Sequence, residues 1–422
     1  MKFAGRRSKW WVTLIAAVCW LTVMPAPGTL LAASLEVDEE LGNSPYQFWG
    51  FLSKDNITIG THGQGTFRHW LGITSVKSTL ALGAQNGSYG TYDLLLGWLR
   101  VQNEILGLGG TGYFRQIYGL HTIKKDLTLG SQSGSHGIYD LRQGGLTVGG
   151  NEYIGYEGTG KFTQTGGSHK IAGTLTLAAK SGGSGTYDLL GGDLSAKTIE
   201  VKQGGTFNIT GVDNKLTTTV TGDLILEGFL KVTNANLTWD GLITIAASGL
   251  FKTDPSQVNF LDDVKVAGAI QASPGDVLVL HQDLIFEGEH ASANLNQSTV
   301  VFGDGSGAAT VHTIKLPATV KIDTLKIEEG DSIKISNGSL NVRDLEGLVI
   351  DPQNNVIKNI ISEDGSNIIY DQASNPELGG KIYSLTNGGT AIPTPIPASF
   401  LLLATGFLGL VAIWRRQHQK IK

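Results

Sequence analysis

The sequence has almost no cysteine and few charged residues. Its one cysteine among 422 residues is Cys19, which lies in an apolar run near the N-terminus. If this run is removed on export, the remaining chain has no thiol, so a disulfide framework and a cysteine nucleophile are both excluded. Charged residues make up 16% of the chain, and no G-x-S-x-G sequence of the serine-hydrolase type occurs.

Helical periodicity is also missing from the central part of the chain. Glycine accounts for 58 residues, about twice the usual share. Short alternating apolar runs are separated by Gly, Ser and Asn turns, which is the pattern of β-strands. With 41% hydrophobic residues the chain can bury a large core, and the sequence therefore predicts an all-β protein.

One phrase occurs three times. The chain reads GTYDLLLGWL from Gly90, GIYDLRQGGL from Gly137 and GTYDLLGGDL from Gly185, and a Gly-x-Phe sequence lies between consecutive copies. A repeat of roughly 20–25 residues made of strands and glycine turns indicates stacked coils, because one coil cannot bury its apolar face alone. We expect a parallel β-helix or β-solenoid whose aromatic residues form one buried file: Phe67, Tyr92, Phe114, Tyr139, Phe162, Tyr187 and Phe207.

The residue after each of these aromatics should face outward, because strand side chains alternate between the two faces. In the first four coils this position alternates between arginine and aspartate, which avoids like charges on adjacent strands. We therefore expect a surface charge ladder that helps to fix the register of the coils, formed by Arg68, Asp93, Arg115, Asp140 and Asp188.

The N-terminus has the layout of a secretory signal peptide. Four cations precede an apolar run from about Trp10 to Met24, and the small residues Ala32 and Ala33 follow as a cleavage site. An uncleaved N-terminal anchor is the alternative interpretation.

The C-terminus is rich in proline and then apolar. Pro393, Pro395, Pro397 and Ala398 precede an uncharged run that ends at Trp414, at the short limit for a membrane-spanning helix. Arg415 and Arg416 open a basic tail, which the positive-inside rule places in the cytoplasm.

This arrangement resembles the PEP-CTERM sorting signal of Gram-negative bacteria, in the variant written VPLPA. The matching residues are 394–398, with Thr394 in place of Val and Ile396 in place of Leu. The resemblance implies recognition by an exosortase-like membrane protease, removal of the tail, and release to the cell surface or matrix, where such proteins accompany exopolysaccharide. A plain membrane anchor is the alternative.

These features divide the chain into seven parts. They are a signal peptide (1–33), an N-terminal cap (34–55), a regular repeat solenoid (56–210), an irregular continuation of the solenoid (211–385), a Pro-rich linker with the sorting motif (386–397), a transmembrane helix (398–414) and a basic cytoplasmic tail (415–422). An independent β-sandwich is the alternative for 211–385.

Several patterns that resemble chemical sites are better explained by the repeat. Residues 107–112 fit GxGxxG and residues 155–161 fit GxxxxGK, but no helix follows either one, so nucleotide binding is not expected. His121 and His169 occupy equivalent repeat positions about two coils apart, too far to share a metal. We expect no cofactor and no metal.

Polysaccharide cleavage on a β-helix remains as an alternative function. It would need clustered carboxylates. Adjacent Asp262 and Asp263 face opposite ways in a strand, whereas His281 and Asp283 could share a face.

The charge distribution limits the partners. The two ends hold eight of the 32 Lys and Arg residues and no acid, so the stretch between them has 24 basic and 37 acidic residues, a net charge of −13. An acidic body is a poor nucleic-acid ligand. We expect a non-enzymatic, exported structural or adhesive protein, with a carbohydrate-binding surface protein as a further alternative. Its expected partners are the secretion machinery with signal peptidase, an exosortase-like protease, the inner membrane before processing, and exopolysaccharide.

Overall fold

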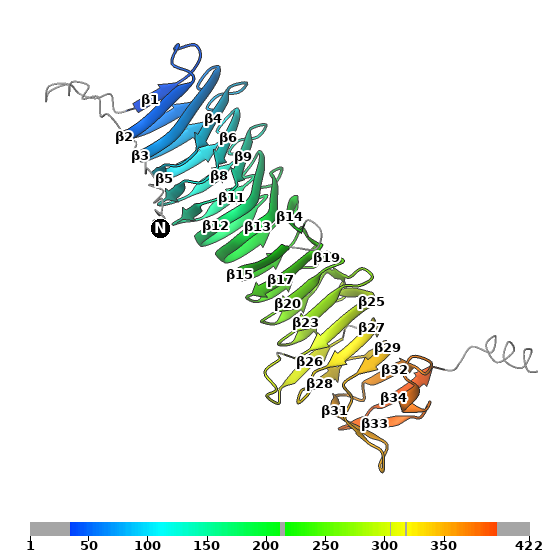
Figure 1. The fold of residues 1–422 in the computed structure, drawn as a ribbon. Coiled ribbons are helices and arrows are strands. Elements are labelled where there is room, and N and C mark those ends of the chain that lie inside the picture. Colours follow the sequence, from blue (N-terminus) through cyan, green and yellow to red (C-terminus); the bar gives the residue numbers. More distant parts are fainter. Residues whose placement is uncertain (1–33, 212–215, 304, 317–318, 395–422) are drawn as a thin grey trace, which may run out of the picture.

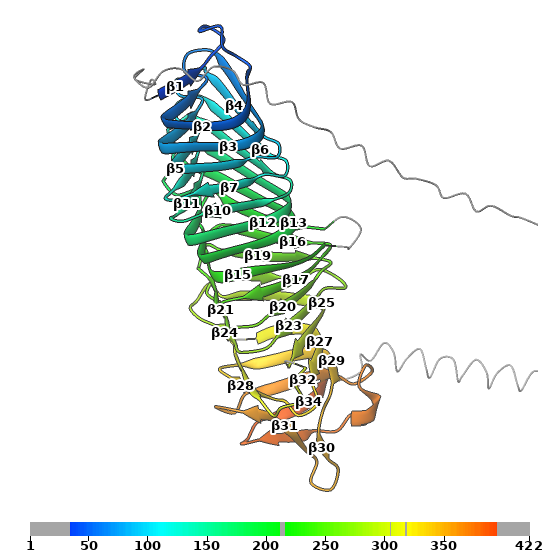
Figure 2. The same cartoon turned by 60° about the vertical axis from the view of Figure 1, so that its left-hand side comes forward.

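The chain folds into a β-solenoid of about 15 turns. The structure is a computed structural model that describes residues 34–211, 216–303, 305–316 and 319–394. Figures 1 and 2 show the coils stacked into one elongated body, with β1 at one end and β33 and β34 at the other. The all-β solenoid expected from the repeat is therefore confirmed.

The first part of the solenoid is the most regular. Each coil contributes up to three short strands or one or two long strands that bend from face to face. The strands are β1 (Ser34–Val37), β2 (Tyr46–Ile59), β3 (Gln64–Leu82), β4 (Tyr89–Leu94), β5 (Trp98–Leu106), β6 (Thr111–Gln116), β7 (Leu120–Ile123), β8 (Leu127–Leu129), β9 (His136–Leu141), β10 (Gly145–Val148), β11 (Glu152–Ile154), β12 (Thr159–Leu177), β13 (Ser184–Val201) and β14 (Gly205–Thr210).

Consecutive coils pair in parallel, and the register gives the coil length. Thr111 of β6 pairs with His136 of β9, which is a long coil, whereas Gly185 of β13 pairs with Gly205 of β14, which is a short one. These two pairings span the period predicted from the repeat, so that period is the length of one coil.

Residues 216–371 continue the same parallel pairing with shorter strands. The strands are β15 (Leu216–Leu226), β16 (Phe229–Thr233), β17 (Ala235–Asp240), β18 (Ile243–Ile245), β19 (Leu250–Asp254), β20 (Gln257–Phe260), β21 (Val264–Val266), β22 (Ala269–Gln271), β23 (Val277–Leu280), β24 (Leu284–Phe286), β25 (Ser292–Phe302), β26 (Val311–Lys315), β27 (Thr319–Ile327), β28 (Ser332–Ser336), β29 (Ser339–Glu346), β31 (Val356–Ser362) and β32 (Asn367–Asp371).

The last coil closes with antiparallel pairs. β30 (Ile350–Asp351) pairs antiparallel with β31, and β33 (Tyr383–Thr386) pairs antiparallel with β34 (Thr390–Thr394). A single 3-10 turn, η1 (Pro376–Leu378), lies between β32 and β33. These hairpins satisfy part of the backbone that a parallel stack would otherwise leave unpaired at its edge.

The other end is closed by the loop between β1 and β2. One carboxylate oxygen of Asp38 accepts hydrogen bonds from the backbone N–H groups of Thr61, His62 and Gly63, at 2.8, 2.9 and 3.1 Å. Burial alone would raise the pKa of Asp38, but these N–H groups outweigh burial and hold its pKa below the ordinary value. The ionised Asp38 thus ties the loop to the first bend.

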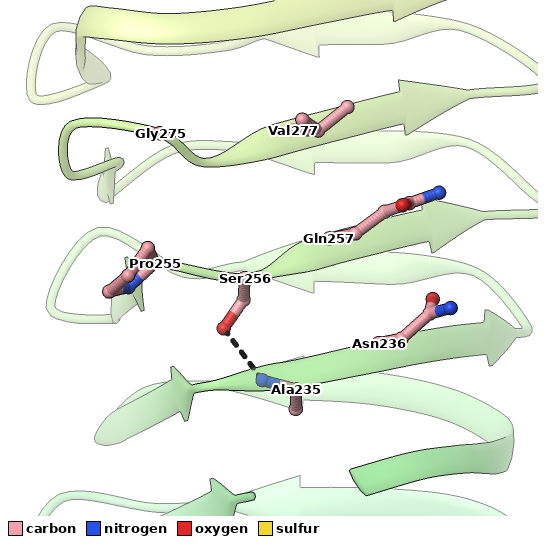
Figure 3. Close-up of a pocket in the computed structure, with 7 residues that line it drawn as sticks. All are labelled: Ala235, Asn236, Pro255, Ser256, Gln257, Gly275 and Val277. Atoms are coloured by element: carbon pink, nitrogen blue, oxygen red, sulfur yellow. Dashed lines mark hydrogen bonds between the residues drawn. The ribbon is translucent and has the colours of Figure 1, made fainter. Parts of the chain in front are cut away.

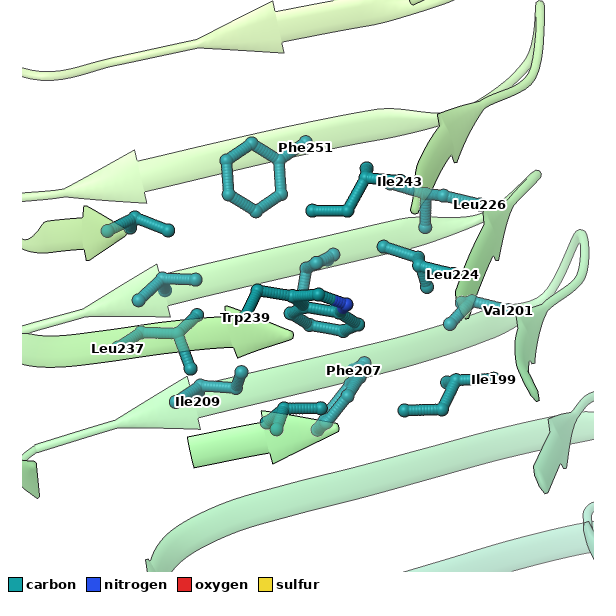
Figure 4. Close-up of a cluster of buried hydrophobic side chains, with 14 of the residues drawn as sticks. Ile199, Val201, Phe207, Ile209, Leu224, Leu226, Leu237, Trp239, Ile243 and Phe251 are labelled. Atoms are coloured by element: carbon teal, nitrogen blue, oxygen red, sulfur yellow. The ribbon is translucent and has the colours of Figure 1, made fainter. Parts of the chain in front are cut away.

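The core changes character along the stack. Beyond Phe207 the continuous file of stacked rings ends and the core mixes aliphatic residues with separate aromatics, and Figure 4 shows Trp239 between Phe207 and Phe251 in this part of the core. The indole N–H of Trp239 donates to the carbonyl oxygen of Gly222 at 3.0 Å, so this buried ring leaves no donor unpaired.

The expected signal peptide, transmembrane helix and basic tail lie outside the described residues. In the described part of the chain, no helix has the length and apolar character required to cross a membrane.

Candidate functional site: the aromatic file and its polar partners

Seven aromatic residues form one fully buried interior file. Neighbouring rings from Phe67 to Tyr187 stack nearly parallel, with centroids 4.7–5.0 Å apart and interplanar angles of 4–13°. Phe207 ends the stack with an edge contact, because its ring lies at 65° to that of Tyr187. The members are Phe67, Tyr92, Phe114, Tyr139, Phe162, Tyr187 and Phe207.

The glycine of the repeated phrase lets adjacent coils approach. A β-carbon on any of these glycines would lie 2.0–2.3 Å from a backbone carbonyl oxygen of the preceding coil. The contacts are Gly90 with Ile59, Gly137 with Leu106, and Gly185 with Ile154. Real β-carbons cannot come that close to an oxygen. The glycine is therefore required by packing of backbone on backbone, and the phrase is a building part of the coil.

Polar side chains sit beside the file in alternate coils. In the first buried cluster, Oε2 of Glu104 lies 2.8 Å from Nε2 of His121, and both side chains are 0% exposed. Nδ1 of His121 lies 2.9 Å from the hydroxyl of Tyr139, which donates to Oε1 of Gln116 at 2.6 Å. The cluster thus spans three consecutive coils.

The hydrogen bonds fix the protons of this cluster. Tyr139 has one hydroxyl proton, which it gives to Gln116, so Nδ1 of His121 must donate to Tyr139. Nε2 of His121 then faces the carboxylate of Glu104, so an acid and a base meet in the core with no access to solvent. Burial, with the nearby Glu104, raises the pKa of Tyr139 well above its ordinary value and keeps the hydroxyl protonated.

The second buried cluster repeats this arrangement two coils further on. Nε2 of His169 is 2.8 Å from Oε2 of Glu152, Nδ1 is 2.9 Å from the hydroxyl of Tyr187, and that hydroxyl donates to Oε1 of Gln164 at 2.5 Å. The side chains of Glu152 and His169 are fully buried. No substrate can reach groups this deep in the core. The glutamate and the histidine of each cluster therefore act only on each other and on the neighbouring tyrosine.

The glutamate and the histidine are absent together elsewhere in the stack. Two coils before the first cluster, the strand register places Ile57 at the position of Glu104 and Thr74 at the position of His121. After the second cluster these positions hold Ile199 and Val220. The intervening coils carry leucine at both, for example Leu127 and Leu146. Because neither charged residue appears without the other, each stabilises its partner in the interior.

At the first tyrosine of the file, Tyr92, the partner of the hydroxyl is a histidine instead of a glutamine. Nδ1 of His69 lies 3.0 Å from the hydroxyl of Tyr92, at the register position that Gln116 occupies two coils later. Burial lowers the pKa of His69 to about 4, so this ring is neutral near neutral pH.

The outward residues of the first coils form an ion pair cluster across neighbouring strands. Arg115 donates to Asp93 across 3.0 Å, and Arg68 lies 3.9 Å from the same carboxylate. The side chain of Asp93 is only 6% exposed, so the two arginines cover it. This part of the ladder follows the expected alternation of charge.

Further along, the pattern is more local than strict alternation predicts. Asp140 pairs with Arg142 of its own coil at 2.9 Å. Asp188 is 3.1 Å from Lys161 and accepts from Asn208 at 2.8 Å. The ladder is therefore a set of separate pairs rather than one continuous row.

The aspartates considered for catalysis accept hydrogen bonds from backbone N–H groups, in two cases from the next coil. Asp263 accepts from the N–H of Asp283 at 3.1 Å, and Asp283 accepts from the N–H of Thr313 at 2.6 Å. Asp262 accepts from the N–H of Asp263. Other Asx residues at coil bends make the same bond to the following coil: Asn56, Asp126, Asn151 and Asp223. The sequence analysis did not predict this series of Asx-to-backbone hydrogen bonds, although the Asp or Asn just before each short apolar run indicated it.

Surface cavities are shallow and mostly lack convergent acids. The cavity in Figure 3, about 320 Å³, is lined by uncharged residues of β17, β20, β23 and the loops before β20 and β23. The hydroxyl of Ser256 accepts there from the N–H of Ala235 at 3.2 Å. A second cavity of about 410 Å³ contains Asp323, Asp371 and Arg343. In the described residues, no three His, Cys, Asp or Glu side chains gather as metal ligands.

Of the sorting-motif residues, the structure describes two, Pro393 and Thr394. Pro393 lies in β34 and pairs with Tyr370 of β32, so the described part of the expected linker belongs to the last coil. Pro395, Pro397, Ala398, Arg415 and Arg416, and the cleavage residues Ala32 and Ala33, lie outside the described residues. Comparison with known proteins gave no family, curated sequence or solved structure that matches this chain.

Proposed function

We propose that this protein is an exported structural or adhesive component of the cell surface or extracellular matrix, with no catalytic role. One observation carries the proposal: the residues that recur along the stack serve the coils themselves. The repeated tyrosine is buried in the aromatic file, its glycine contacts the preceding coil, and the aspartates considered as catalysts bind backbone N–H groups.

The ends of the chain support export through a PEP-CTERM-like signal. The N-terminal cations and apolar run, the proline motif at 393–398 and the basic tail together suggest signal peptidase, an exosortase-like protease and transient residence in the inner membrane. The net charge of −13 between the ends suggests that association with an acidic exopolysaccharide depends on divalent cations.

A polysaccharide-active enzyme is the second candidate, and the cavity with Asp323, Asp371 and Arg343 favours it. A general acid there would need a carboxyl group with a raised pKa. The hydrogen bond from Arg343 instead lowers the pKa of Asp323, and Asp371 accepts from the backbone N–H of Ala373 at 2.7 Å. Both groups thus have structural partners, which supports the non-catalytic proposal.

The test is the fate of the full chain in the cells that make it. We expect the surface or matrix fraction to contain a form that begins near Ser34 and lacks the basic tail, as read by mass spectrometry of both termini. A chain with Pro395→Ala and Pro397→Ala should stay in the membrane fraction with its tail. A wild-type protein that still ends at Lys422 in every fraction would refute sorting by this signal.

A further inference from the structure

The coils at the N-terminal end carry a line of apolar side chains at one bend, of which Phe51, Trp98 and Leu120 are exposed and Ile73 is half-buried. Phe51 pairs with Ile73, Ile73 with Trp98, and Trp98 with Leu120, so these four residues form one outward column across four coils. Phe51 is 73% exposed. The column ends at Gly145, which pairs with Leu120 in the next coil.

A second column of apolar residues runs along the same bend. The ring of Trp49 stacks on that of Trp70 with centroids 6.2 Å apart, and Leu96 and Tyr118 follow in the β4–β5 and β6–β7 connections. Leu96 is 61% exposed. We call the two columns together the apolar ridge. Contiguous exposed apolar surface of this kind marks an interaction site in soluble proteins.

Basic side chains lie beside the ridge, a few residues further along the strands that carry it. Arg100 lies two residues after Trp98, and its guanidinium sits 5.5 Å from the centre of that ring. Arg100, Lys77 and Lys124 line a cavity of about 260 Å³ that contains no acid. Lys77 pairs with Asp55, whereas Arg100 and Lys124 have no ion pair within the described ranges. The body as a whole is acidic, so this local excess of positive charge is unusual.

We propose that the apolar ridge docks this end of the solenoid onto an anionic lipid surface. Tryptophan and tyrosine prefer the boundary between lipid headgroups and acyl chains, and leucine adds apolar area that lipid accepts. The flanking Arg100 and Lys124 would meet the headgroup phosphates, while their aliphatic stems lie against the apolar layer.

Two other occupants fit less well. Leucine gives a sugar ring no flat face and no hydrogen bond, so Leu96 and Leu120 interrupt a stacking platform for polysaccharide. A second copy of the chain, ridge against ridge, would bring Arg100 and Lys124 towards the same cations of its partner, which costs electrostatic energy.

The test uses the full chain with Cys19→Ser, so that one introduced cysteine carries an environment-sensitive fluorophore. The label goes on Leu96→Cys of the ridge or, as the matched control, on Leu190→Cys, an exposed residue at the same bend beyond the ridge. Because both proteins keep the same apolar ends, tethering through those ends affects both labels equally. Circular dichroism checks that each variant is folded.

We expect phosphatidylglycerol vesicles to shift the emission of the label at 96 to shorter wavelength and to leave the label at 190 unchanged. Phosphatidylcholine vesicles should give a smaller shift, and Arg100→Gln with Lys124→Gln should reduce the phosphatidylglycerol shift to that level. No shift at 96, or equal shifts at both positions, would overturn the proposal. So would a shift produced without vesicles, either by polygalacturonate, which would assign the ridge to acidic polysaccharide, or by raising the protein concentration, which would assign it to a second copy.

Discussion

Glu104 and His121 lie 2.8 Å apart (Oε2 to Nε2), come from consecutive coils, and are both completely buried. Each residue is tolerated in the core only because the other is present. In the coils described above that omit one, the other is omitted too, and isoleucine, leucine, valine or threonine takes their places.

Single and double substitutions should therefore have opposite outcomes. Glu104→Leu alone leaves the buried His121 without its acid, and His121→Leu alone leaves the buried carboxylate without a base. Each should lower the free energy of unfolding by about 3–5 kcal/mol. The double variant places in these coils the leucines that neighbouring coils already use, and it should cost much less than either single change.

Urea unfolding of the four proteins gives the coupling directly. Glu152 and His169 provide an independent second cycle in the same chain. Additive effects in both cycles would contradict the view that the charged residues stabilise each other.

His69 should make the protein sensitive to acid. Burial lowers its pKa from 6.5 to about 4, so below pH 6.5 the unfolded chain binds a proton that the folded chain does not. The stability that this neutral histidine contributes is complete above pH 6.5 and is lost as the pH falls towards about 4. The loss attributable to this site should be about 1–3 kcal/mol.

His69→Gln tests this expectation with the residue that the chain itself uses at Gln116 and Gln164. The variant should keep a partner for the hydroxyl of Tyr92 and show a flatter dependence of unfolding free energy on pH in that range. His136→Gln, at the exposed first residue of β9, is the control and should retain the wild-type slope. Equal slopes in wild type and His69→Gln would show that His69 is not responsible.

The glycine of the repeated phrase should not tolerate a methyl group. In Gly137→Ala the new β-carbon would lie 2.3 Å from the carbonyl oxygen of Leu106, so the coils must separate locally, at a cost of about 1–3 kcal/mol. Gly145→Ala is the matched control, because its β-carbon would meet nothing closer than 3.4 Å. Thermal unfolding compares the two variants, and equal midpoints would refute the close-approach argument.

The surface ladder should contribute less than the interior. Asp93→Asn removes the carboxylate that Arg68 and Arg115 share, and we expect a loss of about 1 kcal/mol that shrinks at high salt. Asp188→Asn, whose partners are Lys161 and Asn208, should cost no more. Urea unfolding at low and high salt separates the charge effect from packing. A loss for Asp93→Asn that does not change with salt would point to packing instead.

The sequence predicted the repeating parts of the fold and missed the singular ones. Tyr92, Phe114 and Tyr139 recur at coil spacing with strand alternation around them, so both the coil length and the interior file could be derived. The pairing of His121 with Glu104 could not, because the register that brings two coils together is set by bends whose lengths vary. The equal spacing of Glu104 and Glu152 and of His121 and His169 was the available signal.

The surface was predictable only where charge alternates. Arg115 and Asp93 share a position in consecutive coils and do pair, but Asp140 bonds to Arg142, two residues further on in its own strand region, which the alternation does not predict. The apolar ridge had no sequence signature, since Phe51, Ile73 and Trp98 are unequally spaced along the chain and only the folded register aligns them.

The alternation of tyrosine-bearing and phenylalanine-bearing coils restricts how this body can change its length. Between Phe67 and Phe207, loss or gain of a single coil would put two coils of the same kind in contact, and within the two buried clusters it would separate a glutamate from its histidine. A change by two coils preserves every buried partnership. Lengthening or shortening of this region during evolution should therefore proceed in whole pairs of coils, and engineered versions with a different number of these coils should keep the same unit.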